Sequence, residues 1–303
     1  MSRIIALGEC MVELSLGAEG AGRIAYAGDT FNTAVYLSRL GRAVTYATAL
    51  GGDDPFSRAI LGLADAEGVE TDLVLRLEGK LPGLYAIERD ERGERRFFYW
   101  RGEAAVRDYF QRADLDALGR AMREAEMVFL SGITLAVIGE AGRAALGGLL
   151  KDARDAGVAV AFDPNYRPRL WTDAAAARAA AEAVIPLCAH VSVSGPDAVD
   201  LCGERAEAVA AGWAAMGPEV VRREEDRTVA IHAGGAVEVI PPGPAVDGVV
   251  DTTGAGDSFN GAYLAARLAG RTPAEAVAAG RRLAEAVIRH TGAIIPRDAT
   301  PAL

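Results

Sequence analysis

Short hydrophobic runs alternate with longer segments of helical spacing along most of this chain. The strand-like runs are Arg3–Leu7, Thr45–Ala49, Met127–Ser131, Val158–Asp163, His190–Val193, Val220–Arg222 and Thr228–His232. Helical spacing covers Thr30–Leu40, Pro55–Glu67, Gly139–Ala156, Ala174–Ile185, Asp257–Leu268 and about Pro273–His290. Because alternating strands and helices form parallel sheets, the pattern predicts an α/β fold. Its central sheet is expected to be mostly parallel, with helices on both faces.

Two stretches break this alternation and are typical of β-hairpins. They are residues 10–27 and residues 81–101, and the second contains the turn sequence Asp90–Gly93. We expect the two hairpins to form a small β-sheet lid over the crevice of the main sheet, within a single domain spanning residues 1–303. The alternative is a pair of edge hairpins that only cover the main sheet.

The composition restricts the class of protein. The 303 residues are 50% hydrophobic, which allows a sizeable core, and the formal net charge is −10. This charge argues against nucleic acid or an anionic membrane as a partner. We expect no membrane-spanning segment and no signal peptide, because no apolar run is long enough for either. The three cysteines Cys10, Cys188 and Cys202 lack metal-ligand spacing, so a reduced, cytoplasmic setting is expected.

Polar residues lie near the ends of four strand-like runs. They are Ser131, Asp163, Ser194 and Asp251, the last of which closes the run Val246–Asp251. Ligands of parallel α/β sheets bind beyond the carboxyl ends of the strands. We therefore expect these four side chains to face one crevice.

The run Asp251–Asp257, with the sequence DTTGAGD, lies between a predicted strand and a predicted helix. Gly254 and Gly256 allow a tight turn that brings backbone N–H groups close to a ligand, and the helix adds its positive end. Such a loop is suited to phosphate. Asp257, in the first helical turn, is a candidate base for a hydroxyl group that attacks the phosphate. From the loop alone, the alternative is an ordinary helix N-terminus at which Asp257 interacts with the helix dipole.

Two motifs carry a resemblance to a known family. Asp251–Phe259, continued by Gly261-Ala262, resembles the C-terminal signature of the ribokinase (PfkB) carbohydrate kinases. Gly28–Ala34, followed by Gly41 and Gly51, is similar to the N-terminal signature of that family. The resemblance implies a ribokinase-like fold and an ATP-dependent sugar kinase.

The family resemblance also implies roles for individual residues. It implies that Asp257 is the general base. The residues implied to hold the transferring phosphoryl group are Gly254, Ala255 and Gly256. Gly28, Asp29 and Asn32 are implied to bind the sugar, and a carboxylate with a carboxamide suits a polyol. Most relatives have a small residue where Asp29 stands, and the alternative role for Asp29 is a helix N-cap.

Further segments resemble the 2-keto-3-deoxygluconate kinases of this family. They are residues 8–14, 81–85, 99–101, 165–171 and 292–297. The residues implied to lie on the lid over the sugar are Tyr85, Tyr99 and Arg101. Asn165 and Arg167 are implied to lie between the sugar and the ATP phosphates, where Arg167 stabilises the transferring charge. Guanidinium groups suit the carboxylate of a keto acid; the alternatives are surface ion pairs for the arginines and hairpin packing for Tyr99.

The resemblance implies a specific reaction. It is the phosphorylation of 2-keto-3-deoxygluconate by ATP at the terminal (C6) hydroxyl, giving 2-keto-3-deoxy-6-phosphogluconate. The residues expected to bind the nucleotide are Asn165, Arg167, Ser194, Asp251, Gly254 and Gly256. Mg²⁺ is implied to neutralise the ATP phosphates. Residues 194–197 replace the Asn-x-x-Glu of many relatives, so we assign no protein ligand to the metal, and a monovalent cation near the glycine loop stays open.

Some features leave alternatives open. Relatives usually have a glycine after the basic residues at positions 222–223, and Glu224 stands there in this chain. Acidic groups near ATP phosphates repel them unless they point outward. The alternatives are a kinase for 2-keto-3-deoxygalactonate, fructose or ribose, and a non-catalytic sugar-binding regulator. Lids of this family often pair across a dimer, so a homo-oligomer, a dimer or larger, is expected.

Overall fold

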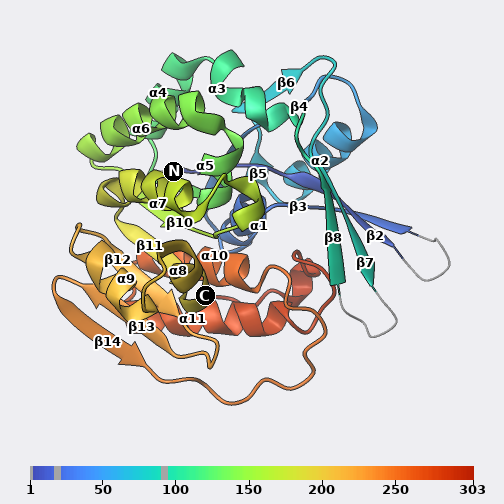
Figure 1. Cartoon of the computed structure of the whole chain (residues 1–303). Coiled ribbons are helices and arrows are strands. Elements are labelled where there is room, and N and C mark those ends of the chain that lie inside the picture. The colour runs from blue at the N-terminus through green and yellow to red at the C-terminus, as the bar shows by residue number, and fades with distance from the viewer. Residues whose placement is uncertain (1–2, 17–21, 90–94) are drawn as a thin grey trace.

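The computed structural model describes residues 3–16, 22–89 and 95–303 and contains a large and a small sheet (Figure 1). The large sheet has the strand order β14-β13-β12-β11-β10-β9-β1-β4-β5, and β6 also pairs with β4. Its strands are β1 (Arg3–Leu7), β4 (Ala43–Gly51), β5 (Val69–Glu70), β6 (Val74–Leu77), β9 (Met127–Ser131), β10 (Ala159–Asp163), β11 (His190–Ser194), β12 (Glu219–Arg223), β13 (Val229–Ala233) and β14 (Ala236–Ile240). Only the pairs β12–β13 and β13–β14 are antiparallel, so the predicted mostly parallel sheet is confirmed.

Helices cover both faces of the large sheet (Figure 1). One layer holds α1 (Asp29–Arg39), α2 (Pro55–Ala66), α10 (Ala255–Leu268) and α11 (Pro273–Val287). The other holds α3 (Tyr109–Arg112), α4 (Leu115–Arg123), α5 (Gly132–Val137), α6 (Gly139–Asp155), α7 (Ala174–Val184), α8 (Gly195–Cys202) and α9 (Ala206–Ala214). Ile5 of β1 packs into one core and Ile4 into the other. Burial on both faces explains why the inner strands are continuous hydrophobic runs.

The small sheet projects from one side of the molecule (Figure 1). It contains β2 (Met11–Leu16), β3 (Gly22–Ala27), β7 (Leu84–Arg89) and β8 (Arg95–Trp100), in the order β3-β2-β7-β8. The two predicted hairpins are confirmed, and a parallel pairing of β2 with β7 joins them. The predicted turn at residues 90–93 lies outside the described residues. The register places Glu13, Tyr85 and Tyr99 side by side on one face of this sheet.

The approach to the glycine loop differs from the sequence prediction. The described residues 241–254 contain no strand, so the predicted strand end at Asp251 is wrong. The backbone N–H groups of Val250 and Asp251 instead both donate to the carbonyl of Ile288, just after α11. Val249 and Val250 are more than half exposed, so these strand-forming residues find no neighbouring strand to pair with. A short valine run predicts an extended chain, but it does not show whether a partner strand exists.

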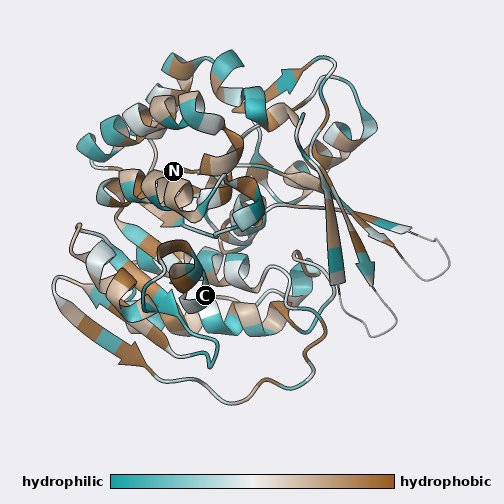
Figure 2. Ribbon diagram, viewed as in Figure 1, coloured by the Kyte–Doolittle hydropathy of each residue, from teal (hydrophilic) through white to brown (hydrophobic). Residues whose placement is uncertain are grey.

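The outer strand β14 is present in the structure although the hydrophobic pattern does not predict it. Its Val237 and Val239 are 54% and 61% exposed on either side of Glu238, an alternation visible in the hydropathy colouring (Figure 2). Short elements such as β5, β6, α5 and α8 are also absent from the prediction, because periodicity is weak over so few residues. Within the described ranges, no helix is both long and apolar enough to cross a membrane.

Candidate active site

The glycine loop leads into α10, whose N-terminus forms the centre of the candidate site. Gly254 is the N-cap and has φ 76°, a left-handed conformation that favours glycine. A Cβ added there would also stand 2.8 Å from Cα of Ala293. The helix begins at Ala255, two residues before the predicted start, and Asp257 lies in its first turn as predicted, beside N–H groups that have no partner within the helix. The loop and helix end are therefore arranged to receive an anion next to a carboxylate.

Asp251 braces this loop. Its Oδ1 accepts hydrogen bonds from the backbone N–H of Thr253, at 3.0 Å, and from the Thr253 hydroxyl, at 2.7 Å. Its Oδ2 accepts a bond of 3.1 Å from the backbone N–H of Gly292. The carboxylate thus ties the loop to a segment about 40 residues further along the chain, which is a positioning role.

The two signature motifs meet at Asp257. The side-chain amide of Asn32 donates to Oδ2 of Asp257 at 2.8 Å, across 225 residues of sequence. The hydroxyl of Thr33 donates to the Asp257 carbonyl at 3.1 Å. Gly28 caps α1, and a Cβ there would stand 1.9 Å from the carbonyl oxygen of Glu9, so only glycine allows this close approach. The N-termini of α1 and α10 therefore both face the candidate base.

A second hydrogen-bonded pair lies beside the first. Asn165 donates through Nδ2 to Oδ2 of Asp29 at 2.8 Å, and it has a left-handed backbone with φ 35°. Asp29 is the first residue of α1, and its Oδ1 accepts from the N–H of Thr30 at 2.8 Å. The N-cap is Gly28, so the alternative reading of Asp29 as the cap is wrong. Asp29 instead turns its other oxygen toward the strand end at β10.

Three further residues lie next to the site: Asp163, which was expected to face the crevice, and Asn260 and Arg223, which the sequence did not single out. Asp163, at the end of β10, is buried and accepts through Oδ2 from Asn260 at 2.6 Å and from Arg223 at 3.5 Å. A Cβ added at Gly256 would stand 3.0 Å from Nη1 of Arg223, so this guanidinium lies against the glycine loop. The available signals were weak: Asn260 lies three residues after Asp257, and Arg223 ends a strand.

Two carboxyl groups of this cluster, those of Asp257 and Asp163, have raised pKa values. Burial, and after it the charge of Asp29, raise the pKa of Asp257 to about 7, whereas the Asn32 hydrogen bond opposes the shift. Burial likewise raises the pKa of Asp163 to about 6, against the lowering effect of Arg223. A carboxylate with a pKa near neutrality can take a proton and release it again at physiological pH.

The lid residues form pairs of their own. The hydroxyl of Tyr85 donates to the carboxylate of Glu13. The ring of Tyr99 lies 5.9 Å from that of Tyr85 and is 45% exposed, so it is available on this face. Arg101 forms a buried ion pair with Glu9, and not the surface pair considered from the sequence. Burial raises the pKa of Glu9, and Arg101 opposes that shift.

Arg167 and Ser194 lie at the N-terminus of α8. The Arg167 side chain is 52% exposed, and its Nη1 lies 3.8 Å from Oδ1 of Asp197. Its charge lowers the pKa of Asp257, which shows that the two groups interact. Ser194 caps α8 by accepting a bond of 3.1 Å from the N–H of Asp197. Among the described residues, no group of three or more His, Cys, Asp or Glu side chains is arranged to hold a metal ion.

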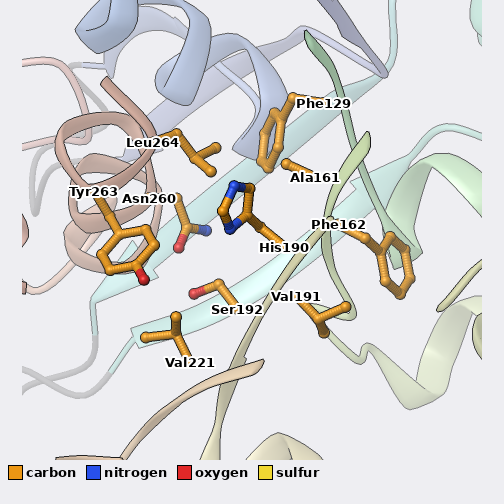
Figure 3. Close-up of a pocket in the computed structure, with 10 residues that line it drawn as sticks. All are labelled: Phe129, Ala161, Phe162, His190, Val191, Ser192, Val221, Asn260, Tyr263 and Leu264. Atoms are coloured by element: carbon orange, nitrogen blue, oxygen red, sulfur yellow. The ribbon is translucent and has the colours of Figure 1, made fainter. Parts of the chain in front are cut away.

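A small cavity lies behind this cluster, between α10 and the strands (Figure 3). Its volume of about 10 Å³ is close to the room that one water molecule needs. Ser192 Oγ and Asn260 Oδ1 face it and are buried without a hydrogen-bond partner in the described part of the chain. The cavity is too small for a substrate. A water there would hold the Asn260 amide in place to donate to Asp163.

Comparisons with known proteins agree with this geometry. The model of the pfkB family of carbohydrate kinases matches residues 1–300. The chain is 41% identical to the 2-dehydro-3-deoxygluconokinase of Dickeya dadantii, over 99% of this chain and 98% of the relative. It is 40% identical to the protein of the same name from Escherichia coli, over 99% of each. A solved structure of a putative ribokinase II from E. coli in complex with ATP and Mg²⁺ has the same fold, with a TM-score of 0.84 at 21% identity, and covers 100% of this chain and 96% of that one.

The full-length match agrees with the meeting of the two motifs at Asp257. Asn32 and Asp257 come from the two ends of the matched region and are joined by a hydrogen bond. The relatives align along the whole chain, and the fold of the solved structure covers the whole chain as well. This chain belongs to the pfkB family of carbohydrate kinases.

Proposed function

We propose that this protein uses ATP to phosphorylate 2-keto-3-deoxygluconate, also called 2-dehydro-3-deoxygluconate, at its terminal C6 hydroxyl. The observation that carries the proposal is the half-buried Asp257, held by Asn32 beside the N-terminus of α10. A base next to an anion site is the arrangement that transfer of a phosphoryl group to a hydroxyl requires. The 40–41% identity to 2-dehydro-3-deoxygluconokinases supports the choice of substrate.

The reaction assigns one step to Asp257. As the C6 oxygen attacks the γ-phosphorus, its proton passes to a carboxylate oxygen of Asp257. The bond between the γ-phosphorus and the bridging oxygen breaks, and ADP leaves with that electron pair. Because burial raises the pKa of Asp257 to about 7, the carboxylate is a stronger base than an exposed aspartate.

The transferring phosphoryl group is stabilised by backbone groups and arginines. The N–H groups of Gly254, Gly256 and Asp257 would point at its oxygens from the positive end of α10, whereas that of Ala255 donates to the carbonyl of Thr252 at 3.3 Å and holds the loop. Arg223 lies against the loop at Gly256, and the charge of half-exposed Arg167 lowers the pKa of Asp257. These cations would offset the charge that develops in the transition state.

The acceptor half of the site binds the sugar acid. We define this half by Gly28, Asp29, Asn32, Tyr85, Tyr99, Arg101 and Asn165. Asp29 and Asn32 would bind sugar hydroxyls, with Tyr85 and Tyr99 covering them from the small sheet. Arg101 contacts Glu9 through Nη2 and would present its remaining N–H groups to the substrate carboxylate. Residues 10–27 and 81–101 would thus act as a lid within one domain of residues 1–303.

The donor half of the site binds the nucleotide. We define this half by the loop Gly254–Gly256, the strand ends at Ser194 and Arg223, and the side chains of Arg167, Arg222 and Glu224. Asp251 would contribute by holding the loop. The ATP and Mg²⁺ of the E. coli ribokinase II structure support the same pair of ligands here. Mg²⁺ would supply charge neutralisation of the phosphates, and Asp163 and Asp197 would hold it through their carboxylate oxygens, with water as the intermediary.

The outer face of the small sheet supports assembly with a second copy of this chain. It is the face opposite to Tyr85 and Tyr99. The hydrophobic residues exposed on it are Leu16, Ile24, Phe98 and Trp100, at 40%, 51%, 38% and 62%. Exposed apolar patches of this kind are typical of interfaces. Sedimentation should show at least a dimer, and Trp100→Arg should shift it to the monomer; a monomeric parent chain would contradict the proposal.

A panel of acceptors tests the substrate directly. The purified protein is mixed with Mg²⁺, ATP and one acceptor, and ADP formation is followed. We expect the highest kcat/KM with 2-keto-3-deoxygluconate, a lower value with 2-keto-3-deoxygalactonate, and little turnover with fructose or ribose, which lack the carboxylate. Higher activity with a neutral sugar would reject the assignment to a keto acid. ATP binding without turnover of any acceptor would favour a non-catalytic regulator.

A further inference from the structure

One charged pair of the donor half has no role in the steps above. Arg222 and Glu224 alternate with Arg223 along the end of β12, so they point toward α8 while Arg223 points toward α10. Arg222 Nη1 and Glu224 Oε1 form an ion pair, with side chains only 15% and 28% exposed. Glu224 therefore does not point outward into solvent, in contrast to its exposed neighbours Glu225 and Asp226.

The carboxylate of Glu224 lies on the N-terminus of α8. A Cβ added at Gly195, the first residue of that helix, would stand 2.1 Å from Oε2 of Glu224. Glycine at this position therefore leaves the space that the carboxylate fills. The positive end of a helix and an arginine are both groups that attract anions. In the free protein this chain supplies the anion itself.

The bound nucleotide is expected to extend past Glu224 and the N-terminus of α8. In-line transfer places the attacking hydroxyl and the leaving group on opposite sides of the phosphoryl group. The sugar side is defined by Asn32, which contacts Asp257 from α1. The leaving ADP must therefore extend the other way, over the ends of β11 and β12. Ser194 and Arg223 are paired there in register, and Glu224 is the next residue.

We propose that Glu224 sets the nucleotide affinity of this protein, acting as an internal anion that competes with ATP phosphates for Arg222 and the N-terminus of α8. The proposal rests on the proposed function, because it uses the direction of phosphoryl transfer. Binding of ATP must displace this carboxylate or accept its repulsion. The protein therefore binds Mg–ATP more weakly than the same chain with an uncharged residue at position 224.

The turn that carries Glu224 does not depend on its side chain. The N–H of Glu224 donates to the carbonyl of Thr228 at 2.9 Å, and the N–H of Arg227 donates to the carbonyl of Glu224 at 2.9 Å. Arg227 closes the turn in a left-handed conformation with φ 70° and is held by carbonyls of Gly243 and Pro244. A substitution of the side chain at position 224 thus changes the charge and leaves these backbone bonds in place.

The experiment compares Glu224→Gln with Glu225→Gln in the full chain. Both remove one carboxylate, but Glu225 is exposed and serves as the matched control. Calorimetry with Mg–ATP in the absence of sugar gives Kd, and initial rates give KM for each substrate. We expect Glu224→Gln to lower Kd and the KM for ATP about tenfold, with the KM for the sugar unchanged. The difference should shrink as salt is added, and Glu225→Gln should match the parent chain.

Equal Kd values for the parent chain and Glu224→Gln would overturn the proposal, and so would weaker binding by the variant. Glu224→Gly provides a second test without a side-chain amide, and thermal unfolding of each variant checks that it is folded. Normal phosphorylation of the keto acid with unchanged nucleotide affinity would reject the role of Glu224 and keep the proposed function. Tighter nucleotide binding by Glu224→Gln, together with no turnover of any sugar by the parent chain, would reject the proposed function and keep the role of Glu224.

Discussion

The acceptor half and the donor half of the site use different groups to bind their ligands. In the acceptor half, side chains bind one another before any ligand arrives, as in the Asn32–Asp257 and Asn165–Asp29 bonds of 2.8 Å. In the donor half, backbone N–H groups and arginines lie around a glycine loop whose conformation depends on Gly254. The acceptor half therefore depends on the identity of its side chains, whereas the donor half depends on backbone geometry and net charge.

The difference explains which half tolerates change. An altered side chain in the acceptor half leaves its hydrogen-bond partner buried and unsatisfied, which is costly. In the donor half, Glu224 adds a negative charge without altering a backbone bond. Four substitutions test the two halves, beginning with the residue at which they meet.

The largest effect is expected for Asp257→Asn. An amide cannot take the proton, so kcat should fall about a thousandfold, while its oxygen can still accept from Asn32. The folded pKa of about 7 lies above the unfolded value, so wild-type stability falls as pH rises toward 7. The amide introduced by Asp257→Asn does not ionise, so the free energy of unfolding of the variant at pH 8 should exceed that of the wild type by on the order of 1 kcal/mol. The difference between the two should close toward pH 4.

Rate assays and urea unfolding at both pH values measure these changes. Asp152→Asn, at an exposed position on α6, is the control and should alter neither. Near-normal turnover of Asp257→Asn would show that Asp257 is not the general base.

The acceptor half is tested at Arg101. Because Arg101 and Glu9 form a buried pair, removal of one alone leaves an unpaired charge, so Arg101→Gln is combined with Glu9→Gln. The loss of a charge-assisted contact should raise the KM for the keto acid by about a hundredfold. Glu9→Gln alone is the comparison, because it removes the same carboxylate and keeps the guanidinium; since it leaves that guanidinium unpaired, thermal unfolding checks that both variants are folded. An unchanged KM in the double variant would show that Arg101 serves only its ion pair.

The donor half is tested at Gly254. Alanine there meets both an unfavourable φ of 76° and Ala293, so we expect a loss of about 2 kcal/mol in the free energy of unfolding, together with a lower kcat. Gly157→Ala is the matched control, since Gly157 has φ 88° but no atom within 4 Å of an added Cβ. Equal losses for the two variants in urea unfolding would mean that packing on Ala293 does not hold the loop.

The smallest effect is expected for Asp29→Asn. The negative charge of Asp29 raises the pKa of Asp257, so its removal should move the acidic limb of the kcat/KM profile to lower pH. The overall rate also falls if Asp29 binds a hydroxyl, but the position of the limb is independent of that. Asp65→Asn, exposed on α2, serves as the control. A limb that stays in place would show that Asp29 does not act on the base through its charge.

The sequence predicts the sheet and its helices well where hydrophobic runs are long. β9, for example, is predicted at the bounds that the structure has, because its five residues are all buried. The sequence does not predict the structure where a contact with a distant segment determines whether a strand forms or a residue joins the site. Val250 has the β-propensity of a strand residue, but its N–H bonds to the end of a helix. Asn260 gains its place in the site from its contact with Asp163, and Arg223 from its contacts with Asp163 and the loop at Gly256.

The attachment of the glycine loop to Gly292 and Ala293 also orders events during synthesis. The strands of the large sheet end with β14 at residue 240, but the contacts that shape the phosphate-binding loop come from residues 288–293. A chain growing from its N-terminus can pair all of these strands before residues 288–293 have emerged. The protein therefore completes its phosphate site only after this later segment has been made, when its sheet can already be formed.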